Sequence, residues 1–264
     1  MKIIIFQGGL GNQLFENAFY NFQSKLNQGK TYFIFRGKSH NGFELSRYFK
    51  TNLQELPYLY SLLFKSIDYI AKKLKLNLFT LENDFYENGR GVVFDGYWQN
   101  KEFLPHSDIS FKELPLSQKN LELRSQMEST FSVSIHVRRG DYLLPQFRDI
   151  YGNVCTAAYY QKAIELCKQK NTKCNFFIFS DDIKWCKENL QVDNATFIDW
   201  NTGDDSIYDM YLMSFAKINI IANSTFSFWG ASLNKNNILT IYPKKWFNSK
   251  YQAPNIFPEE WVGL

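Results

Sequence analysis

The stretch Ser134-Ile135-His136-Val137-Arg138-Arg139-Gly140-Asp141-Tyr142 decides the fold of this 264-residue chain. Residues 132–137 predict a buried strand, and two adjacent arginines follow where that strand ends. Guanidinium groups bind phosphate oxygens in a bidentate way and stay charged at physiological pH. The pattern therefore predicts a strand that delivers positive charge to a glycine turn, where a pyrophosphate would fit. The alternative, which the sequence leaves open, is that one arginine bridges Asp141 across the turn.

Strand and helix signals alternate steadily after this stretch. An alternation of this kind is typical of a parallel sheet covered by helices, which binds ligands beyond the carboxyl ends of its strands. The expected strands are 175–179, 196–198, 218–222 and 238–242, and the expected helices are 157–168, 183–190, 206–215 and 225–233. The chain begins in the same way, with a strand at 2–6, a helix at 12–26 and further strands at 31–35 and 92–94.

Residues 105–115 predict the boundary between two domains. This segment is polar, is bounded by prolines and has no clear period. A chain of 264 residues is long enough to bury two modest hydrophobic cores. We therefore expect two α/β domains, 1–115 and 116–264.

Two more expected strand ends carry residues suited to anions. Asn223, Ser224 and Thr225 follow the strand 218–222 and open a helix, where free backbone N–H groups favour an anion. Ser224 or Thr225 may equally be an ordinary N-cap. Gly8-Gly9-Leu10-Gly11 follows the first strand, but it lacks the endings typical of a phosphate loop or a dinucleotide-binding turn. Neither an NTPase nor a dinucleotide enzyme is supported.

Carboxylates are present near the strand ends without the spacing of a metal site. Asp181 follows the strand 175–179, and Asp209 lies in the helix before the hydroxyl-rich turn. A carboxylate can accept the paired N–H donors of a guanine edge, or a ribose hydroxyl, although Asp181 may equally cap a helix. No D-x-D triplet occurs, so arginines and helix N-termini are expected to neutralise a leaving diphosphate without a metal ion.

The composition excludes several other classes of protein. The formal charge of +4 is spread along the chain, whereas a nucleic-acid-binding protein would show a denser basic stripe. The four cysteines form no C-x-x-C pair, and the three histidines have no metal-like spacing from them. Residues 3–6 form too short an apolar run for a signal peptide. A cytoplasmic protein with reduced thiols is expected.

Residues 57–81 show helical spacing of large apolar residues, with lysines between them. Most such helices pack on a core, but a basic amphipathic helix also fits a membrane surface. The spacing agrees with both interpretations, so peripheral contact with the inner face of a membrane stays open.

Three stretches resemble the signatures of the α-1,2-fucosyltransferases, glycosyltransferase family 11. They are GGLGNQLF at 8–15, HVRRGDY at 136–142 and NSTFSFWG at 223–230, and their order and spacing match that family over nearly the whole chain. The resemblance implies a GT-B-like α/β fold with two Rossmann-like domains whose parallel sheets face a cleft. The acceptor would face residues 1–115, and residues 116–264 would bind GDP-fucose.

The resemblance also implies roles for individual residues. Arg138 would hold the β-phosphate, Arg139 and Asp141 would support the same turn, and His136 and Asp209 would approach the guanine. Ser224 and Thr225 would bind phosphate, and Asn12 would lie near the departing oxygen. The implied catalytic residues are Arg138, Asn12 and Asp141. The implied donor-binding residues are Gly11, Asn12, His136, Arg138, Arg139, Asp181, Asp209, Asn223, Ser224 and Thr225.

The implied reaction moves L-fucose from GDP-β-L-fucose to the 2-hydroxyl of a terminal galactose, with inversion and without a cofactor or metal. The acceptor would be an oligosaccharide of a surface polysaccharide or of a lipid-linked repeat unit. Tyr97 and Trp98 would either stack on an acceptor sugar or belong to the core. Glu16, Asp95 and Asp141 are the carboxylates near the motifs that would serve as a base. α-1,6-Fucosyl transfer and protein O-fucosyl transfer use the same donor and remain the alternatives.

Overall fold

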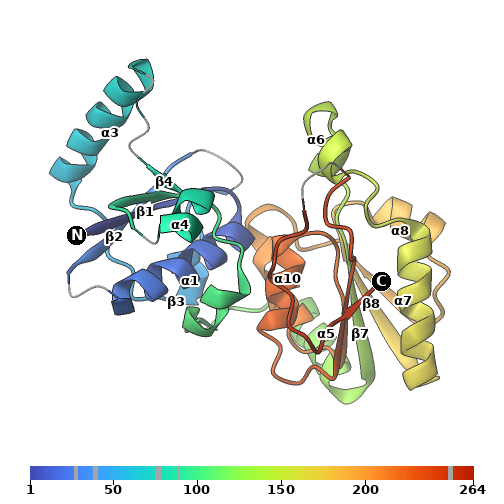
Figure 1. Cartoon of the computed structure of the whole chain (residues 1–264). Coiled ribbons are helices and arrows are strands. Elements are labelled where there is room, and N and C mark those ends of the chain that lie inside the picture. Colours follow the sequence, from blue (N-terminus) through green and yellow to red (C-terminus); the bar gives the residue numbers. More distant parts are fainter. Residues whose placement is uncertain (27–28, 38–40, 75, 77–78, 89, 249–251) are drawn as a thin grey trace. The chain divides into compact units, whose positions relative to one another are not determined.

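The computed structural model describes residues 1–26, 29–37, 41–74, 76, 79–88, 90–248 and 252–264. The chain divides into two compact units, Met1–Lys112 (unit 1) and Glu113–Leu264 (unit 2), and each contains its own parallel sheet (Figure 1). The division falls three residues before residue 115, where the composition predicts the end of the first domain.

Unit 1 is built on a four-stranded parallel sheet with the strand order β2-β1-β5-β4. These strands are β1 (Lys2–Phe6), β2 (Thr31–Phe35), β4 (Thr80–Leu81) and β5 (Val93–Asp95). A small antiparallel pair joins β3 (Phe49–Lys50) to β6 (Ser110–Phe111). The helical segments are α1 (Leu10–Leu26), α2 (Leu45–Tyr48), α3 (Tyr58–Lys73), α4 (Glu82–Asn88) and the 3₁₀ helix η1 (Lys101–His106).

Aromatic rings fill the centre of unit 1. Phe19 of α1 stacks on Trp98, with ring centroids 3.8 Å apart and planes 4° from parallel. Phe94 and Phe103 meet the edges of the Phe19 ring. Trp98 is fully buried, so it is a core residue and not a stacking surface for an acceptor sugar, whereas Tyr97 is partly exposed.

Unit 2 is built on a six-stranded parallel sheet with the order β12-β11-β10-β7-β8-β9. The strands are β7 (Phe131–Val137), β8 (Cys174–Ser180), β9 (Ala195–Ile198), β10 (Ile218–Ile220), β11 (Leu239–Tyr242) and β12 (Val262–Gly263). The helices are α5 (Gln118–Ser129), α6 (Pro145–Tyr151), α7 (Ala157–Lys170), α8 (Ile183–Asn189), α9 (Ile207–Met213) and α10 (Thr225–Ser232), with 3₁₀ turns η2 (Asp141–Leu143) and η3 (Gly203–Ser206).

The strand that carries the arginine pair lies in the interior of the unit 2 sheet. β7 pairs with β8 along its whole length and with β10 on its other side. Six of its seven residues are buried, as expected for a strand covered on both faces. The four cysteines, all in this unit, are buried and free. Central placement in a buried sheet fixes the position at which β7 ends.

Four of the differences from the expected elements matter most, and they concern α1, α3, β6 and α5. α1 begins at Leu10, so the glycine turn is shorter than expected and Gly11 is helical. α3 ends at Lys73, and β4 occupies the end of the range in which one long helix is expected. β6 lies inside the expected linker and pairs with β3 of unit 1. α5 is not expected, because only Asn120, Leu123 and Met127 of its largely polar sequence are buried.

A buried asparagine links β10 to its neighbours. Asn219 Nδ2 donates to Ser134 Oγ of β7 at 2.6 Å and to the Met213 carbonyl at 2.8 Å. Its Oδ1 accepts a hydrogen bond from Asn234 Nδ2 at 2.9 Å. Buried polar groups that lose their partners keep the cost of leaving water, so these bonds constrain the packing of unit 2.

Asn219→Ala is expected to lower the free energy of unfolding by about 1–3 kcal/mol, because it leaves buried donors and acceptors without partners. Chemical denaturation followed by tryptophan fluorescence measures the change. Asn189→Ala is the matched control, since Asn189 is exposed at the end of α8 and a surface change of this kind shifts stability by less than about 0.5 kcal/mol. Equal shifts in the two variants would contradict this interpretation of the Asn219 contacts.

Candidate active site

Arg138 follows β7 directly and is held between two carboxylates. Its Nη2 lies 2.8 Å from Asp141 Oδ1, and its Nη1 lies 3.1 Å from Asp181 Oδ2. Asp181 follows β8, the neighbouring strand, so the guanidinium joins the carboxyl ends of two strands. All three side chains are partly exposed. The bridge to Asp141 left open by the sequence is therefore present, and it fixes Arg138 at the edge of the sheet.

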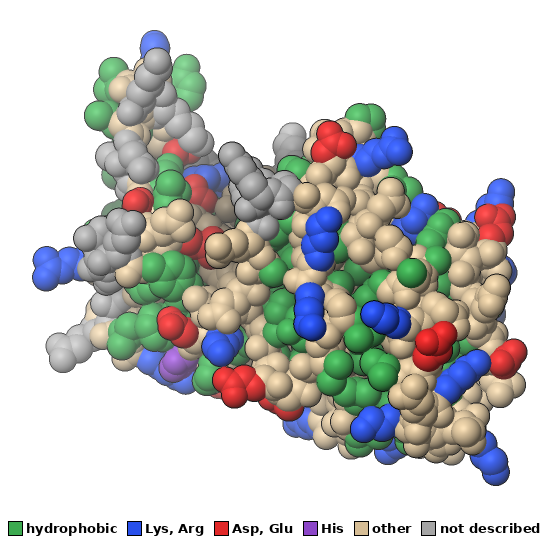
Figure 2. Space-filling model, turned by 45° about the vertical axis from the view of Figure 1, so that its right-hand side comes forward, with side chains coloured by type: hydrophobic (Ala, Val, Ile, Leu, Met, Phe, Trp, Pro, Cys, Tyr) green, Lys and Arg blue, Asp and Glu red, His purple; other side chains and the backbone are tan. Residues whose placement is uncertain are grey.

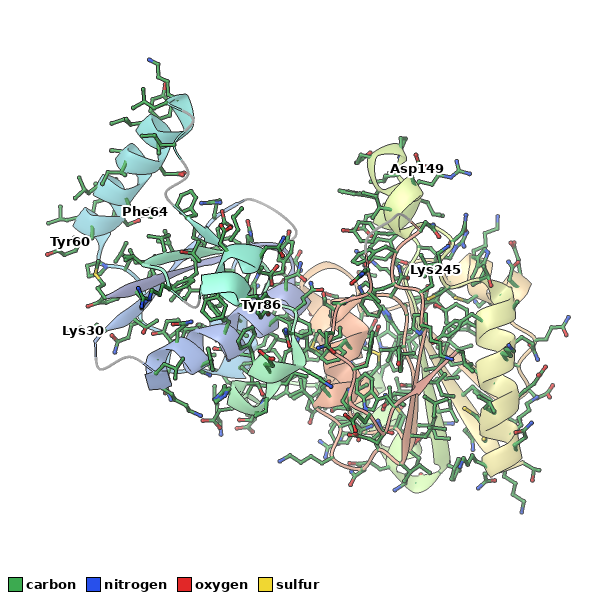
Figure 3. All side chains as sticks on the ribbon, viewed as in Figure 1. Lys30, Tyr60, Phe64, Tyr86, Asp149 and Lys245 are labelled. Atoms are coloured by element: carbon green, nitrogen blue, oxygen red, sulfur yellow. The ribbon has the colours of Figure 1, made fainter. Side chains whose placement is uncertain are left out.

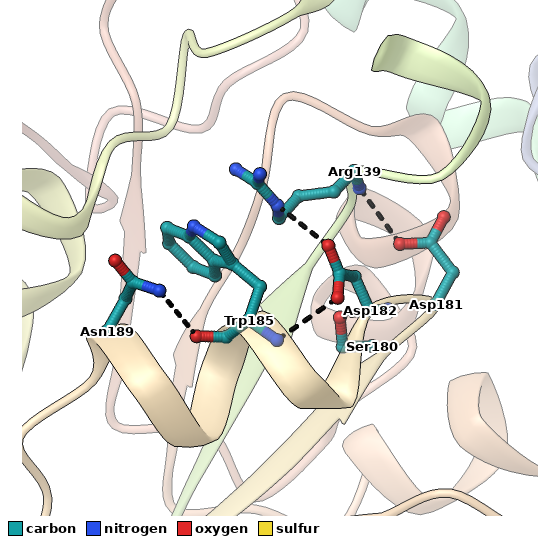
Figure 4. A network of polar contacts seen from close by, with 6 residues as sticks. All are labelled: Arg139, Ser180, Asp181, Asp182, Trp185 and Asn189. Carbon is teal, nitrogen blue, oxygen red and sulfur yellow. Dashed lines mark hydrogen bonds and ion pairs between the residues drawn. The ribbon is translucent and has the colours of Figure 1, made fainter. Parts of the chain in front are cut away.

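Arg139, the next residue, contacts the two aspartates that follow β8 (Figure 4). Its backbone N–H donates to Asp181 Oδ1 at 2.8 Å, and its Nε donates to Asp182 Oδ2 at 3.1 Å. The guanidinium also lies over the Trp185 ring, 4.2 Å from the ring centroid. The Arg139 side chain is therefore held by Asp182 and Trp185, at the start of α8.

The helix cap after β8 is Asp182. Its carboxylate accepts a hydrogen bond from the Trp185 backbone N–H at 3.1 Å, as an N-cap side chain does (Figure 4). Asp181, which the sequence leaves as either a cap or a ligand residue, instead contacts Arg138 and Arg139. Gly140 permits this contact, because a Cβ at that position would lie 2.7 Å from Asp181 Oδ2.

His136 is a buried, neutral imidazole on β7. Burial, and then the positive charge of Arg138, lower its pKa to about 3. Tyr160 donates a hydrogen bond to the His136 carbonyl at 3.1 Å, and the imidazole lies 5.6 Å from the Phe226 ring. Its Nδ1 has no hydrogen-bond partner among the described residues. His136 therefore adds no positive charge to this edge of the sheet.

The turn after β10 is connected to the arginine turn through Tyr142. Arg138 lies over the Tyr142 ring at 5.7 Å, and Tyr142 OH donates to the Asn223 carbonyl at 3.0 Å. Thr225 is the first residue of α10, and the side chain of the N-cap Ser224 makes no capping hydrogen bond. The three strand ends of β7, β8 and β10 therefore meet at one edge of the sheet, beside a helix N-terminus.

The side chains of Asn223 and Asp209 both make hydrogen bonds within unit 2. The Asn223 side-chain amide donates to the carbonyls of Trp246 at 3.1 Å and Tyr151 at 3.3 Å, so it shapes the turn from inside. Asp209 Oδ1 accepts a hydrogen bond from Asn201 Nδ2 at 2.8 Å. Burial raises the pKa of the Asp209 carboxyl to about 8. Among the described residues, no hydrogen bond or ion pair joins Asp209 to Arg138.

Gly11 and Asn12 belong to unit 1, at the start of α1. Asn12 Oδ1 accepts a hydrogen bond from Gln99 Nε2 at 3.1 Å. Gly8 has a φ of 74°, and a Cβ there would lie 2.7 Å from Asn12 Nδ2. Glycine at position 8 therefore lets the turn pass close to Asn12 while that side chain stays at the carboxyl end of β1.

A polar cluster lies at the carboxyl edge of the unit 1 sheet, and no sequence motif connects its members. Arg36 Nη1 pairs with Asp95 Oδ2 at 2.6 Å, and Gln7 Nε2 donates to Asp95 Oδ1 at 3.1 Å. Glu16 accepts the Gln7 backbone N–H, and burial raises the pKa of its carboxyl. Gln7, Arg36 and Asp95 each end or follow a strand, which is the signal that singles out the residues of unit 2.

Glu82, the first residue of α4, is another carboxylate that the sequence does not single out. It accepts backbone N–H groups of Tyr97, Trp98 and Gln99, and burial raises its pKa. A Cβ on Gly96 would lie 2.6 Å from Glu82 Cγ, so glycine allows the chain to wrap this carboxylate. Glu82 thereby holds the 96–99 turn that carries Tyr97.

A metal-binding cluster and a membrane-spanning helix are both absent from the part of the chain that the structure describes. Within these residues, no three His, Cys, Asp or Glu side chains come together in a way that would hold a metal ion. Among the described helices, none has the length and apolar character needed to cross a membrane. His40 lies outside the described residues.

Proteins of known structure resemble the chain in fold. The fucosyltransferase NodZ from Bradyrhizobium aligns with a TM-score of 0.52 and 14% identity, covering 87% of this chain and 91% of NodZ. A NodZ α-1,6-fucosyltransferase crystal soaked with GDP-fucose gives a TM-score of 0.51 at 15% identity, with the same coverage. At this identity the likeness shows the fold alone, and it confirms the expected GT-B-like α/β architecture.

Curated relatives match the sequence over its whole length. An α-1,2-colitosyltransferase of Escherichia coli is 34% identical, covering 100% of this chain and 99% of that protein. A galactoside α-(1,2)-fucosyltransferase 2 of Rattus norvegicus is 28% identical, covering 97% of this chain and 75% of that protein. Residues 4–264 match the family described as Glycosyl transferase family 11. The chain therefore belongs to glycosyltransferase family 11.

Proposed function

We propose that the chain transfers L-fucose from GDP-β-L-fucose to the 2-hydroxyl of a terminal galactose on an oligosaccharide, with inversion and without a metal ion. The observation that carries the proposal is the Arg138 guanidinium, fixed between Asp141 and Asp181 and connected through Tyr142 to the start of α10. Relatives named as galactoside α-(1,2)-fucosyltransferases support the bond and the acceptor sugar.

In the proposed reaction, the acceptor hydroxyl attacks the anomeric carbon from the face opposite GDP. The bond between that carbon and the β-phosphate oxygen breaks, and GDP leaves with the electron pair. Each Nη group of Arg138 carries two N–H donors, so donors remain for phosphate oxygens beside the two aspartates. The Thr225 hydroxyl and backbone N–H, at the start of α10, would add to the same stabilisation, whereas the Ser224 backbone N–H already donates to the Ala222 carbonyl at 2.8 Å.

The three carboxylates that the sequence offers as a base are all engaged by other groups. Asp141 pairs with Arg138, Asp95 pairs with Arg36, and the buried Glu16 accepts the Gln7 backbone N–H. We therefore propose that the rate depends mainly on stabilising the leaving GDP, with an oxocarbenium-like transition state that needs little from a base.

A second donor sugar competes with fucose in this proposal. The Escherichia coli relative is named as a colitosyltransferase, and it aligns with the whole chain. α-1,6-Fucosyl transfer, the activity for which NodZ is named, is supported only by a likeness of fold. The donor base and diphosphate would bind in the same way in each case, so only the product distinguishes these activities.

Arg138→Ala is expected to lower kcat/KM for GDP-fucose by at least about a hundredfold, because it removes charge that faces the leaving group. Steady-state kinetics measure the loss. Arg124→Ala is the matched control, since Arg124 also pairs with a carboxylate, Glu128, in unit 2. Thermal unfolding of both variants checks the fold. An Arg138→Ala enzyme with unchanged kcat/KM would exclude the phosphate role.

Transfer to lactose and to a Galβ1,3GalNAc acceptor is expected to give an α-1,2 product from GDP-fucose, with EDTA present. NMR of the product reads the linkage. GDP-colitose in a parallel reaction tests the competing sugar, and the donor with the higher kcat/KM is the natural candidate. Activity that is lost in EDTA and restored by Mg²⁺ would overturn the metal-independent mechanism, and an α-1,6 product would overturn the proposed bond.

Asp209 is expected to make GDP binding depend on pH. Its pKa of about 8 keeps the carboxyl protonated below that pH, and only the ionised form accepts two guanine N–H donors. GDP affinity should therefore rise between about pH 6.5 and about pH 8.5 in the wild type, relative to Asp209→Asn. Titration calorimetry measures both proteins, and changes in GDP ionisation cancel in the comparison. Parallel pH profiles would remove Asp209 from the guanine site.

A further inference from the structure

Helix α3 of unit 1 exposes a long apolar stripe. Its members recur at intervals of three or four residues and are 45% to 77% exposed. They are Leu59, Leu63, Ile67, Ile70 and Leu74, the last just beyond the helix. This spacing places them along one face. Of the 21 large hydrophobic side chains that are exposed in the described residues, ten lie between Tyr58 and Leu76.

A different face of α3 attaches the helix to unit 1. Phe64 packs against the cluster formed by Ile3, Ile5, Ile34 and Leu56 beside the sheet, and its ring lies 6.0 Å from Phe79. Ala71, two turns further on, is buried. The exposed stripe is therefore not needed for packing within the unit, and its residues lie in water.

The figures show the same separation. α3 stands out from the sheet of unit 1 (Figure 1). Hydrophobic side chains gather on the protruding helix in Figure 2. Tyr60 points away from the sheet in Figure 3. An exposed apolar patch of this size on a single element marks an interaction surface.

The remaining composition of α3 indicates the kind of surface it meets. The helix contains three lysines, Lys65, Lys72 and Lys73, and one acidic residue, Asp68. Tyr58, Tyr60 and Tyr69 are exposed, and tyrosine favours the boundary between lipid headgroups and acyl chains. In a helix that combines lysines with an apolar face, the lysines bind anionic headgroups while the apolar side chains enter the acyl boundary.

We propose that α3 lies in the surface of a membrane that contains anionic lipids and holds the protein there. Its 16 residues are too few to cross a bilayer. Pairing of two α3 helices from two copies of the chain would bring like charges together, since each helix carries a net charge of +2 from three lysines and one aspartate. An anionic membrane satisfies the apolar stripe and the lysines at once.

Cosedimentation with vesicles tests the proposal on the full chain. Vesicles of phosphatidylcholine with about one third phosphatidylglycerol should bind the protein at least about tenfold more tightly than pure phosphatidylcholine, and added salt should weaken the binding. The variant Leu63→Glu/Ile67→Glu/Ile70→Glu should lose at least about tenfold in affinity for the anionic vesicles. These residues face water, so the variant should keep its thermal unfolding midpoint.

Leu121→Glu is the matched control, because Leu121 is an exposed leucine on helix α5 of unit 2. It should bind anionic vesicles like the wild type. Equal binding of the triple variant and the wild type would overturn the proposal, as would equal binding to neutral and anionic vesicles. A wild type that binds no vesicles but forms dimers by light scattering, with monomers in the triple variant, would assign the stripe to a second copy instead.

Discussion

The contact of Arg138 with Asp141 and Asp181 is the constraint on which the site in unit 2 depends. One cation joins the end of β7 to the end of β8, and the Arg138 side chain then lies over Tyr142, which donates to the turn after β10. A free arginine at the surface would sample many rotamers, whereas this one is held by two charged partners before any ligand arrives. Preorganisation of this kind lowers the reorganisation needed when negative charge develops on a leaving group.

The same contact shows that the site does not work by excess positive charge. Two arginines face three aspartates, and burial together with Arg138 keeps His136 neutral. Attraction for the diphosphate of the proposed donor would then come from N–H groups at fixed positions, on the guanidinium and at the start of α10. Gly140 is part of this arrangement because a side chain there would displace Asp181. Geometry at short range, more than net charge, makes this edge suited to a diphosphate.

Much of unit 2 could be predicted from the sequence because its strands are buried on both faces and follow one another in a βα alternation. The α5 helix could not, since only three of its twelve residues are buried and no apolar period results. Trp98 shows a second limit: its aromatic, polar neighbourhood suits a sugar site, but its ring stacks on Phe19 in the core. Sequence spacing also cannot tell that the apolar residues of α3 face water, because a core face and a membrane face share one period.

The site residues also divide into those that local sequence patterns predict and those that depend on the folded structure. Arg138 and Asp181 directly follow strands, so their place at the edge of the sheet is predicted from local pattern alone. The sequence does not predict that Asp182, and not Asp181, caps α8. Either carboxylate fits the position before α8, and only the direction of the turn decides. Gln7, Arg36 and Asp95 of unit 1 come together from distant parts of the chain, and no short motif connects them.

The decisive measurement is a crystal structure of the chain with GDP bound. Oxygens of the β-phosphate should lie about 3 Å from the Arg138 guanidinium, with Asp141 and Asp181 still beside it. A diphosphate bound away from Arg138, with both aspartate contacts unchanged, would contradict the role given to this arginine and leave the turn with a structural function only.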